Sequence, residues 1–391
     1  MIVRQFISWV RTASAGERAE ATRSLARAWL VSDLTADDRA AAEGALLMLL
    51  DDPSALVRQA MAEVFARSAD APASIVQALS LDQASVALPV LEHSPLLIDA
   101  DLVDIVATGT CEVQCAIARR VRVPASVCAA IAEVGSAAAA LELIENAYAE
   151  LAPFSWDRIV ERHGHLAAIR EAMLVLQDLP AATRAALVAK LSDTLAQFVV
   201  ARNWLSADRA LRIASEARER SNVNIASRSR GEDMRGLVRH LRATGQLTAG
   251  LILRALLSGN LELFDTALAE LSGLPQGRVS ALLHDRGRAS LDALLSRAGL
   301  PESTYAAFRM ALETSRETGF ADSLGGVARL RRRMVERVLT HCETDRPAAE
   351  PLLILLRRFA TESAREEARV FCDGLMADET LAPVPGNLIA A

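Results

Sequence analysis

The chain has 391 residues, of which 51% are apolar, 24% charged and 4% aromatic. This length accommodates two or three domains with large buried cores, and so high an apolar content excludes a disordered chain. With 43 basic and 49 acidic residues, the net charge of −6 gives the chain as a whole no attraction to nucleic acid or to an anionic membrane surface.

The residue usage favours helices packed against helices. Glycine occurs 19 times and proline 13 times, and runs that alternate β-branched or aromatic residues with polar ones are few. An extensive sheet requires such runs, because successive side chains of a strand face opposite sides. The sequence therefore predicts an all-α fold.

Residues 1–152 contain a series of short helical patterns separated by Asp, Ser, Pro and Gly, at intervals of roughly 25 to 30 residues. The clearest unit spans residues 35–67, where the turn Asp51-Asp52-Pro53 separates two helices. We expect Asp52 to cap the second of these helices and Pro53 to lie in its first turn. A period of this length is typical of stacked helix pairs.

The stretch from Asp52 through Val57 to Arg58 resembles the second helix of a HEAT repeat, a helix pair whose copies stack into a curved solenoid. HEAT repeats use an Asp and an Arg as a side-chain ladder between units, and Asp52 and Arg58 stand at these positions. In the next two units the aligned residues are Ala87 and Gln114 instead of Arg. The resemblance implies a HEAT-like solenoid whose ladder is irregular.

Two long helices are predicted after a break near Pro153. In residues 181–202, one apolar stripe recurs at every third or fourth position, formed by Leu187, Leu191, Leu195 and Phe198. The second helix begins at Ser206, and the short connection makes the two an antiparallel hairpin. Because an apolar hairpin can pair with its copy across a two-fold axis, we expect a homodimer.

Shorter helices are predicted from residue 231 onward. The sequence Gly273-Leu274-Pro275 returns 26 residues later as Gly299-Leu300-Pro301. In each copy the glycine ends one helix and the proline opens the next. Two further helices are expected over residues 323–342 and 348–376, the first with its interior face formed by Leu330, Met334, Val338 and Cys342.

These patterns predict three domains. HEAT-like helical repeats occupy residues 1–152, and a long helical hairpin or bundle occupies residues 153–235. A C-terminal helical array follows over residues 236–391, and its tail from residue 377 is expected to fray.

Several spaced turns and helix starts stand together in the C-terminal half: Leu237-Val238-Arg239, Gly245-Gln246-Leu247-Thr248, Leu253-Arg254-Ala255-Leu256, Gly259-Asn260-Leu261-Glu262-Leu263-Phe264 and Gly273-Leu274-Pro275. With these motifs the chain resembles a bacterial family, the uncharacterised domain of unknown function 2336, over roughly residues 35–320. The resemblance implies an all-helical bacterial cytoplasmic protein without an established activity. It carries over no catalytic residue.

Two small clusters have the residue types of a metal site. Glu161, His163 and His165 lie close together in sequence, and Cys111 and Cys115 share one face of a helix. A structural zinc site needs four ligands, which neither cluster supplies, so we predict no metal and no cofactor. The five cysteines are expected to be reduced thiols in the cytoplasm.

Histidine phosphotransfer, or docking of a response regulator, is the alternative function that the hairpin suggests. A histidine exposed on an antiparallel helical bundle can accept a phosphoryl group without further catalytic residues of its own. No histidine lies in the hairpin, and the nearest are His165 before it and His240 after it. These two are the candidate phosphoacceptors of this alternative.

Arginines gather in residues 119–122, 228–242 and 329–337, where the last group follows a helical stripe and is expected to be a solvated face. Guanidinium groups bind phosphate and carboxylate groups. The second helix of each unit of a solenoid faces its concave side, which there forms an extended groove. The predicted partner-binding residues are therefore Arg58, Arg119, Arg120 and Arg122.

The sequence contains no phosphate-binding glycine loop, nucleophile elbow, paired-cysteine zinc pattern or His-Glu-x-x-His motif, so we predict no catalytic residue and no enzyme. The leading hypothesis is a scaffold in bacterial signalling that binds another protein on the concave face of the solenoid. Nucleic-acid binding is a third hypothesis, weakened by the net charge of −6, the single lysine and the few aromatic residues. Because no run of about 18 apolar residues occurs, we expect a cytoplasmic protein without a membrane span.

Overall fold

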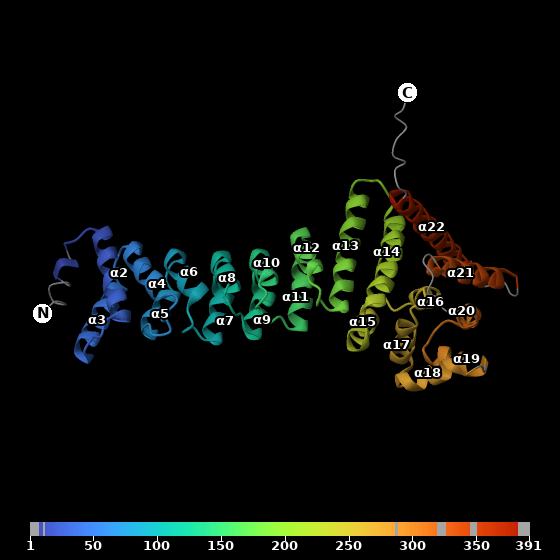
Figure 1. The fold of residues 1–391 in the computed structure, drawn as a ribbon, viewed down its shortest axis with the longest axis horizontal. Coiled ribbons are helices and arrows are strands. Elements are labelled where there is room, and N and C mark those ends of the chain that lie inside the picture. Colours follow the sequence, from blue (N-terminus) through green and yellow to red (C-terminus); the bar gives the residue numbers. More distant parts are fainter. Residues whose placement is uncertain (1–7, 11, 286–287, 319–325, 345–349, 382–391) are drawn as a thin grey trace, which may run out of the picture. The chain divides into compact units, whose positions relative to one another are not determined.

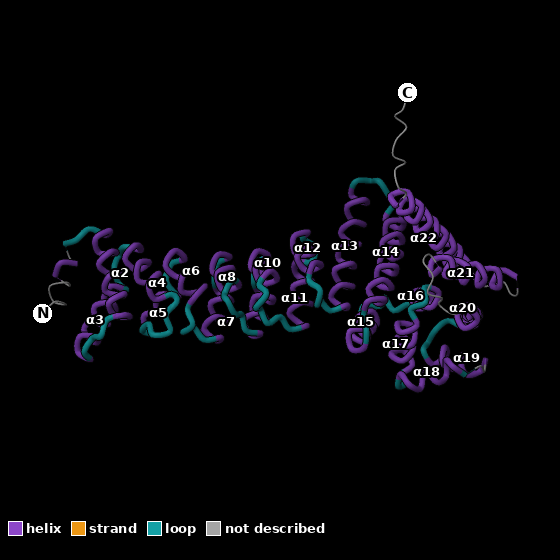
Figure 2. The backbone as a smooth tube through the Cα atoms, in the orientation of Figure 1, coloured by secondary structure: helices purple, strands orange, loops and turns teal. Residues whose placement is uncertain are grey.

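The computed structural model describes residues 8–10, 12–285, 288–318, 326–344 and 350–381. In these residues the fold is all-α, as predicted (Figure 1; Figure 2). The β-type pairing in this part of the chain is limited to an isolated parallel bridge between Val123 and Ala149.

The chain forms two compact units, unit 1 (Met1–Leu179) and unit 2 (Pro180–Ala391). These units do not coincide with the three predicted segments, whose boundaries stay predictions. The helices of residues 153–175 pack on those before them and belong to unit 1.

Unit 1 is a stack of short helices. Each even-numbered helix from α2 to α10 contacts the next even-numbered one, and α7, α9 and α11 form a second row in the same way (Figure 1). That this stack is a HEAT solenoid stays a prediction. The helices are α2 (Ala15–Val31), α3 (Ala36–Leu49), α4 (Ala55–Phe65), α5 (Ala73–Ser80), α6 (Ala84–His93), α7 (Asp99–Thr108), α8 (Cys111–Ala118), α9 (Ala125–Val134), α10 (Ala137–Glu145), α11 (Pro153–His163) and α12 (Ala167–Val175).

The start of α4 differs from the prediction. Its N-cap is Ser54, so Asp52 does not cap it and Pro53 lies outside its first turn. The Asp52 carboxylate instead accepts hydrogen bonds from Nε and Nη2 of Arg18 at 2.7 and 2.8 Å, and from the backbone nitrogen of Ser54 at 2.8 Å. The charge of Arg18 on α2 draws this carboxylate into the contact between two helices.

Further side-chain bonds join the N-terminal ends of the even-numbered helices. Arg58 of α4 donates to both carboxylate oxygens of Asp82, which precedes α6, at 2.5 and 3.0 Å. Gln114 of α8 donates to the carbonyl oxygen of Val106 at 3.1 Å and accepts from the backbone nitrogen of Ser136 at 2.9 Å. An amide therefore continues the ladder at one of the two predicted units that lack the arginine.

Unit 2 begins with the predicted hairpin, because α13 and α14 pack against each other along their length. The remaining helices surround one large apolar core. The elements are α13 (Ala181–Ala201), α14 (Ala207–Arg228), α15 (Gly231–Ala243), α16 (Ala249–Leu257), α17 (Leu261–Ser272), α18 (Gln276–His284), α19 (Arg288–Arg297), the 3-10 turn η1 (Glu302–Thr304), α20 (Tyr305–Thr318), α21 (Gly326–Thr344) and α22 (Glu350–Leu381).

The predicted apolar stripe of α13 is only partly buried. Leu187 is buried, whereas Leu195 is 54% exposed and Phe198 is 46% exposed. Here α13 meets α14 through the small residues Ala196, Ala210 and Ala214, which let the helices approach closely and leave the larger side chains outside. The homodimer that this surface suggested stays a prediction.

The predicted helix ends in the C-terminal part of the chain are confirmed at two glycines. Gly273 and Gly299 have φ angles of 69° and 72°, left-handed values that a side chain disfavours, and each ends a helix as predicted. Met334, Val338 and Cys342 of α21 are buried as predicted. The side chain of Leu330 and residues 323–325 lie outside the described residues.

The final helix is longer than predicted. It continues to Leu381, so the expected fraying is wrong for residues 377–381, and residues 382–391 lie outside the described part. None of the helices in the described ranges is both long and apolar enough to cross a lipid bilayer.

The two units carry net charges of opposite sign. Unit 1 contains 14 arginines against 24 aspartates and glutamates, a net charge of −10. Unit 2 contains 29 basic against 25 acidic residues, a net charge of +4. The overall value of −6 conceals this difference.

Candidate functional site

One edge of unit 1 brings together the ends of successive even-numbered helices. Arg120, which follows α8, donates to the carbonyl oxygens of Leu91 and Ser94 at the end of α6, at 2.5 and 2.6 Å. Asn146, which follows α10, donates to the carbonyl oxygens of Ala118 and Arg120 at 2.9 and 2.8 Å. The C-terminal ends of α6, α8 and α10 therefore adjoin, and each hydrogen bond satisfies carbonyl groups that a helix end leaves unpaired.

We call this border of unit 1, where each even-numbered helix ends and the next odd-numbered helix begins, the junction edge. Its connecting segments also touch each other, since the backbone nitrogen of Glu150 donates to the carbonyl oxygen of Val123 at 3.0 Å. Cys128 donates to the same carbonyl oxygen at 3.3 Å, and burial raises the pKa of this thiol to about 12. The junction edge is thus rigidly built, and Cys128 is an inert part of its core.

A large apolar side chain is exposed at three successive junctions of this edge. Ile98 before α7 is 62% exposed, Val121 between α8 and α9 is 78% exposed, and Tyr148 between α10 and α11 is 71% exposed. Apolar side chains exposed singly are ordinary, but a row at equivalent positions is characteristic of an interaction surface. These three residues were not predicted, because the connections that hold them contain other apolar residues, such as Leu96 and Leu97 before Ile98.

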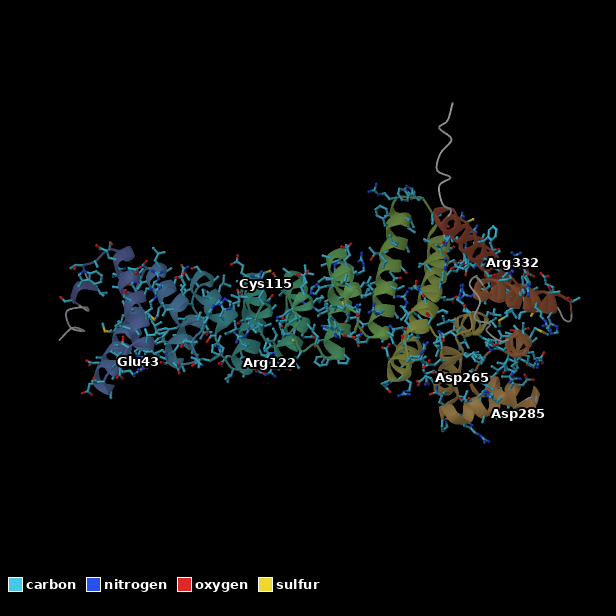
Figure 3. The ribbon with its side chains drawn as sticks, viewed as in Figure 1. Glu43, Cys115, Arg122, Asp265, Asp285 and Arg332 are labelled. Atoms are coloured by element: carbon cyan, nitrogen blue, oxygen red, sulfur yellow. The ribbon has the colours of Figure 1, made fainter. Side chains whose placement is uncertain are left out.

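Three of the four predicted partner-binding arginines lie at the junction edge, where Figure 3 labels Arg122. Arg119 forms an ion pair with Glu142 at 2.5 Å, and Arg122 forms one with Glu150 at 2.9 Å. Arg120 lies between them, and burial, its main influence, lowers the pKa of its guanidinium. Arg119 and Arg122 remain accessible at their ion pairs, whereas Arg120 is occupied by the two helix ends.

Arg58 lies apart from the other three. It stands at the start of α4, on the opposite border of the row of even-numbered helices, and its guanidinium is bound to Asp82 and to the carbonyl oxygen of Asp52. Its side chain is 15% exposed. The structure therefore assigns Arg58 to the ladder between α4 and α6.

Two of the residues considered as metal ligands, a histidine and a cysteine, contact backbone and hydroxyl groups of the protein. Nε2 of His163 lies 3.3 Å from the carbonyl oxygen of Gly135, and burial, followed by the charge of Arg162, lowers the pKa of this imidazole. Sγ of Cys111 lies 3.2 Å from Oγ of Ser136, and burial raises the pKa of Cys115 to about 11. Within the described residues, no three His, Cys, Asp or Glu side chains form a potential metal site.

The two candidate phosphoacceptors lie in different units. His165 is exposed in the turn between α11 and α12 of unit 1, and His240 is half-buried on α15 of unit 2. Neither is part of the α13–α14 hairpin. Their role in phosphotransfer stays a prediction.

Comparison with known proteins gives one match. A family model described as an uncharacterised protein conserved in bacteria (DUF2336) matches residues 86–346, about two thirds of the chain. The matched range contains α7 to α21 and the motifs between residues 237 and 275, and it begins after the HEAT-like stretch at Asp52. No curated protein and no solved structure shows significant similarity to the chain.

Proposed function

The chain belongs to this bacterial family, domain of unknown function 2336, and we propose for it a non-enzymatic role as a scaffold in bacterial signalling that binds another protein along the junction edge of unit 1. The observation that carries the proposal is the row formed by Ile98, Val121 and Tyr148, one at each of three successive junctions. A partner that follows this edge would bury all three side chains at once.

The junction edge suits this role better than the surface of the even-numbered helices. On that surface, charged side chains of neighbouring helices pair with each other, as Arg23 of α2 does with Glu63 of α4. Such pairs compensate their own charges and leave little binding free energy for a partner. The apolar side chains of the junction edge have no such compensation.

Charge indicates the chemistry of the partner. Unit 1 carries a net charge of −10, which repels nucleic acid and attracts a basic protein surface. We therefore propose a basic protein partner whose contact surface includes apolar side chains. The proposal places the complex in the cytoplasm, the compartment in which free thiols such as those of Cys115 and Cys128 stay reduced.

The test uses the full chain as bait in an extract of the native bacterium, followed by purification of the captured protein. Binding of the purified partner is then compared between the native chain and the double variant Val121→Ser/Tyr148→Ser. Two lost apolar contacts of roughly 1 kcal/mol or more each predict at least about ten-fold weaker binding.

The matched control is Leu81→Ser. Leu81 is 72% exposed, but it lies between α5 and α6, at the border opposite the junction edge. We expect this variant to bind the partner as tightly as the native chain. Equal binding by the double variant and the control would refute the junction edge as the docking site.

A further inference from the structure

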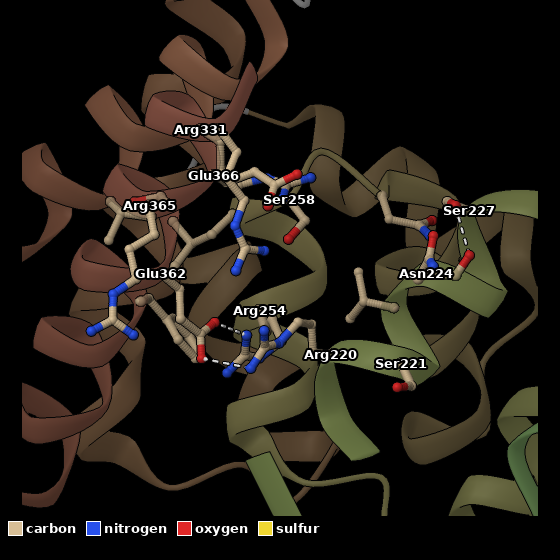
Figure 4. A pocket seen from close by; sticks show the side chains of 17 residues that line it. Arg220, Ser221, Asn224, Ser227, Arg254, Ser258, Arg331, Glu362, Arg365 and Glu366 are labelled. Atoms are coloured by element: carbon tan, nitrogen blue, oxygen red, sulfur yellow. Dashed lines mark hydrogen bonds and ion pairs between the residues drawn. The ribbon is translucent and has the colours of Figure 1, made fainter. Parts of the chain in front are cut away.

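Unit 2 contains a pocket of about 510 Å³ between α14, α16, α21 and α22 (Figure 4). A volume of several hundred Å³ is typical of sites for small organic molecules. The pocket is lined by more arginines than acidic residues, with Glu362 and Glu366 facing Arg220, Arg254, Arg331, Arg365 and Arg369. Its walls therefore carry an excess of positive charge.

The charge of Arg254 is balanced within the protein. This residue of α16 is 6% exposed, and its Nη1 donates to Oε2 of Glu362 at 2.5 Å. Its Nε lies 3.7 Å from Oε2 of Glu219, and its guanidinium carbon lies 4.1 Å from the centre of the Phe359 ring. Arg254 and Glu362 thus form a wall of the pocket in which both charges are largely compensated.

Arg331 of α21 has no such compensation. Its side chain points into the pocket (Figure 4), and it forms no hydrogen bond or ion pair with any residue that the structure describes. Burial lowers the pKa of its guanidinium, and the charge of Glu366 opposes this effect without reaching ion-pair distance. The Arg331 side chain is half-buried, and its Nε atom is fully buried without a hydrogen bond. An unsatisfied charged donor is unfavourable, so a ligand that accepts a hydrogen bond from this atom would be bound favourably.

The other unsatisfied atoms of the pocket are donors as well. The side-chain oxygen of Asn260 accepts a hydrogen bond from the backbone nitrogen of Leu263 at 3.0 Å, which leaves the Asn260 Nδ2 group buried without an acceptor. The Nε atoms of Arg254 and Arg331 are buried without a hydrogen bond in the same way. Three N–H donors from three separate elements therefore line one pocket without a hydrogen bond to a described residue, and of these only the Arg254 Nε has an ion-pair partner, Glu219.

We propose that this pocket binds a small phosphorylated molecule, whose phosphate oxygens accept hydrogen bonds from Arg331 and Asn260. A phosphate monoester carries a charge of about −1.5 to −2 and three terminal oxygens, which suit donors that arrive from different helices. A carboxylate offers two oxygens in one plane and a smaller charge.

The size and the rim of the pocket fit the same class of ligand. The pocket is larger than a phosphate ion requires, and the hydroxyl and amide groups of Ser221, Asn224, Ser227 and Ser258 suit the hydroxyl groups of an attached sugar or alcohol. Arg365 and Arg369 are exposed and attract an approaching anion. This assignment concerns unit 2 and does not depend on the protein partner proposed for unit 1.

The test is calorimetric titration of the full chain with inorganic phosphate, pyrophosphate, adenosine monophosphate and citrate at equal ionic strength. We expect at least one of the phosphorus compounds to bind, and the variant Arg331→Gln to bind it at least ten-fold more weakly. The matched control is Arg333→Gln, an exposed residue two positions away on α21, which should bind like the native chain.

Thermal unfolding provides a second measurement, independent of how well Arg331→Gln folds. Because Arg331→Met removes a half-buried charge that forms no ion pair, it should raise the melting temperature of the ligand-free protein and abolish the further rise that the phosphorus compound produces. Binding of citrate as tight as that of the phosphorus compounds would overturn the phosphate assignment. The absence of any binding up to about 10 mM, or an equal loss in Arg333→Gln, would overturn the site.

Discussion

Units 1 and 2 differ in whether their buried charged groups have partners within the protein. In unit 1 the charged groups within the stack have partners on a neighbouring helix, as Asp52 has in Arg18 and Arg120 has at the end of α6. In unit 2, the Nε atom of Arg331 is buried without a hydrogen bond to any described residue, and burial raises the pKa of Asp265 to about 6. The polar groups of unit 1 join its helices, whereas unit 2 also contains buried N–H groups without a hydrogen bond, which we propose bind a ligand.

The difference follows from the geometry of the two units. In unit 1 each even-numbered helix packs on the next, so a polar group near the start of one helix meets a complementary group before the next, as Arg58 meets Asp82 and Gln114 meets Ser136. In unit 2, helices of 9 to 32 residues pack around each other without a repeat, and a pocket remains between four of them. We expect the first arrangement to present its outer surface and the second to enclose a molecule.

The largest expected effect is the loss of stability when a core phenylalanine of either unit is replaced, which tests whether the two units unfold independently. Phe65 of unit 1 is fully buried against Trp29, with the ring centres 6.0 Å apart, and Phe308 of unit 2 is fully buried against Phe264 at the same separation. Phe65→Ala should destabilise unit 1 by about 4 kcal/mol, and Phe308→Ala should destabilise unit 2 by a similar amount. Calorimetric unfolding should show each variant shifting a different transition. A single transition that moves equally in both variants would show that the units unfold as one.

How far the sequence predicts this fold depends on how local each signal is. Helix ends such as Gly273 were predicted correctly because a left-handed turn that favours glycine is encoded within a few residues. The exposure of Leu195 and Phe198 was not predicted, because periodicity identifies an apolar stripe but does not reveal that α14 meets α13 through Ala210 and Ala214. Small residues on a partner helix decide which side of a stripe is buried.

The candidate sites were less predictable than the fold. The role of Arg119 and Arg122 in partner binding stays a prediction, and their ion pairs could not be predicted because they join residues more than 20 positions apart in sequence. The pocket of unit 2 is harder still, because Asn260 and Arg331 come from elements about 70 residues apart and neither shows by its neighbours that it lacks a partner. Satisfaction of a buried polar group is a property of the assembled structure.

The second largest expected loss of stability follows from breaking the ion pair between Asp52 and Arg18 in unit 1. Asp52→Asn leaves the Arg18 guanidinium, whose side chain is 15% exposed, without its counter-charge, and it should destabilise unit 1 by about 3 kcal/mol at pH 7. Glu63→Gln, which removes the exposed ion pair with Arg23, is the matched control and should cost about 0.5 kcal/mol or less. Urea unfolding of unit 1 measures both. Equal effects would show that the Asp52 pair contributes no more than a surface pair.

Acid provides a further test of the same pair. Arg18 holds the pKa of Asp52 below its ordinary value of 3.8, so the folded state binds the proton less readily than the unfolded state. The stabilisation is therefore fully present above pH 3.8 and is lost as the pH falls through the lower pKa of the folded state. Asp52→Asn should flatten this acid limb of the stability curve of unit 1.

The smallest expected change in stability concerns Asp265 of unit 2, where the substitution should stabilise the protein instead of destabilising it. Burial, weakly opposed by His284, raises the pKa of Asp265 from 3.8 to about 6, so the folded state binds this proton more readily than the unfolded state. Stability from this group is therefore present below pH 3.8 and is lost as the pH rises to about 6. Because the side chain is partly accessible, the loss should be about 2 kcal/mol, less than the full shift implies.

Asp265→Asn should stabilise unit 2 by that amount at pH 7, measured by calorimetry. Glu313→Gln, which changes an exposed residue of the same unit, is the matched control and should have no effect. A less stable Asp265→Asn variant at pH 7 would mean that the carboxylate has a stabilising contact in solution, and the contrast in buried charge between the two units would then rest on Arg331 alone.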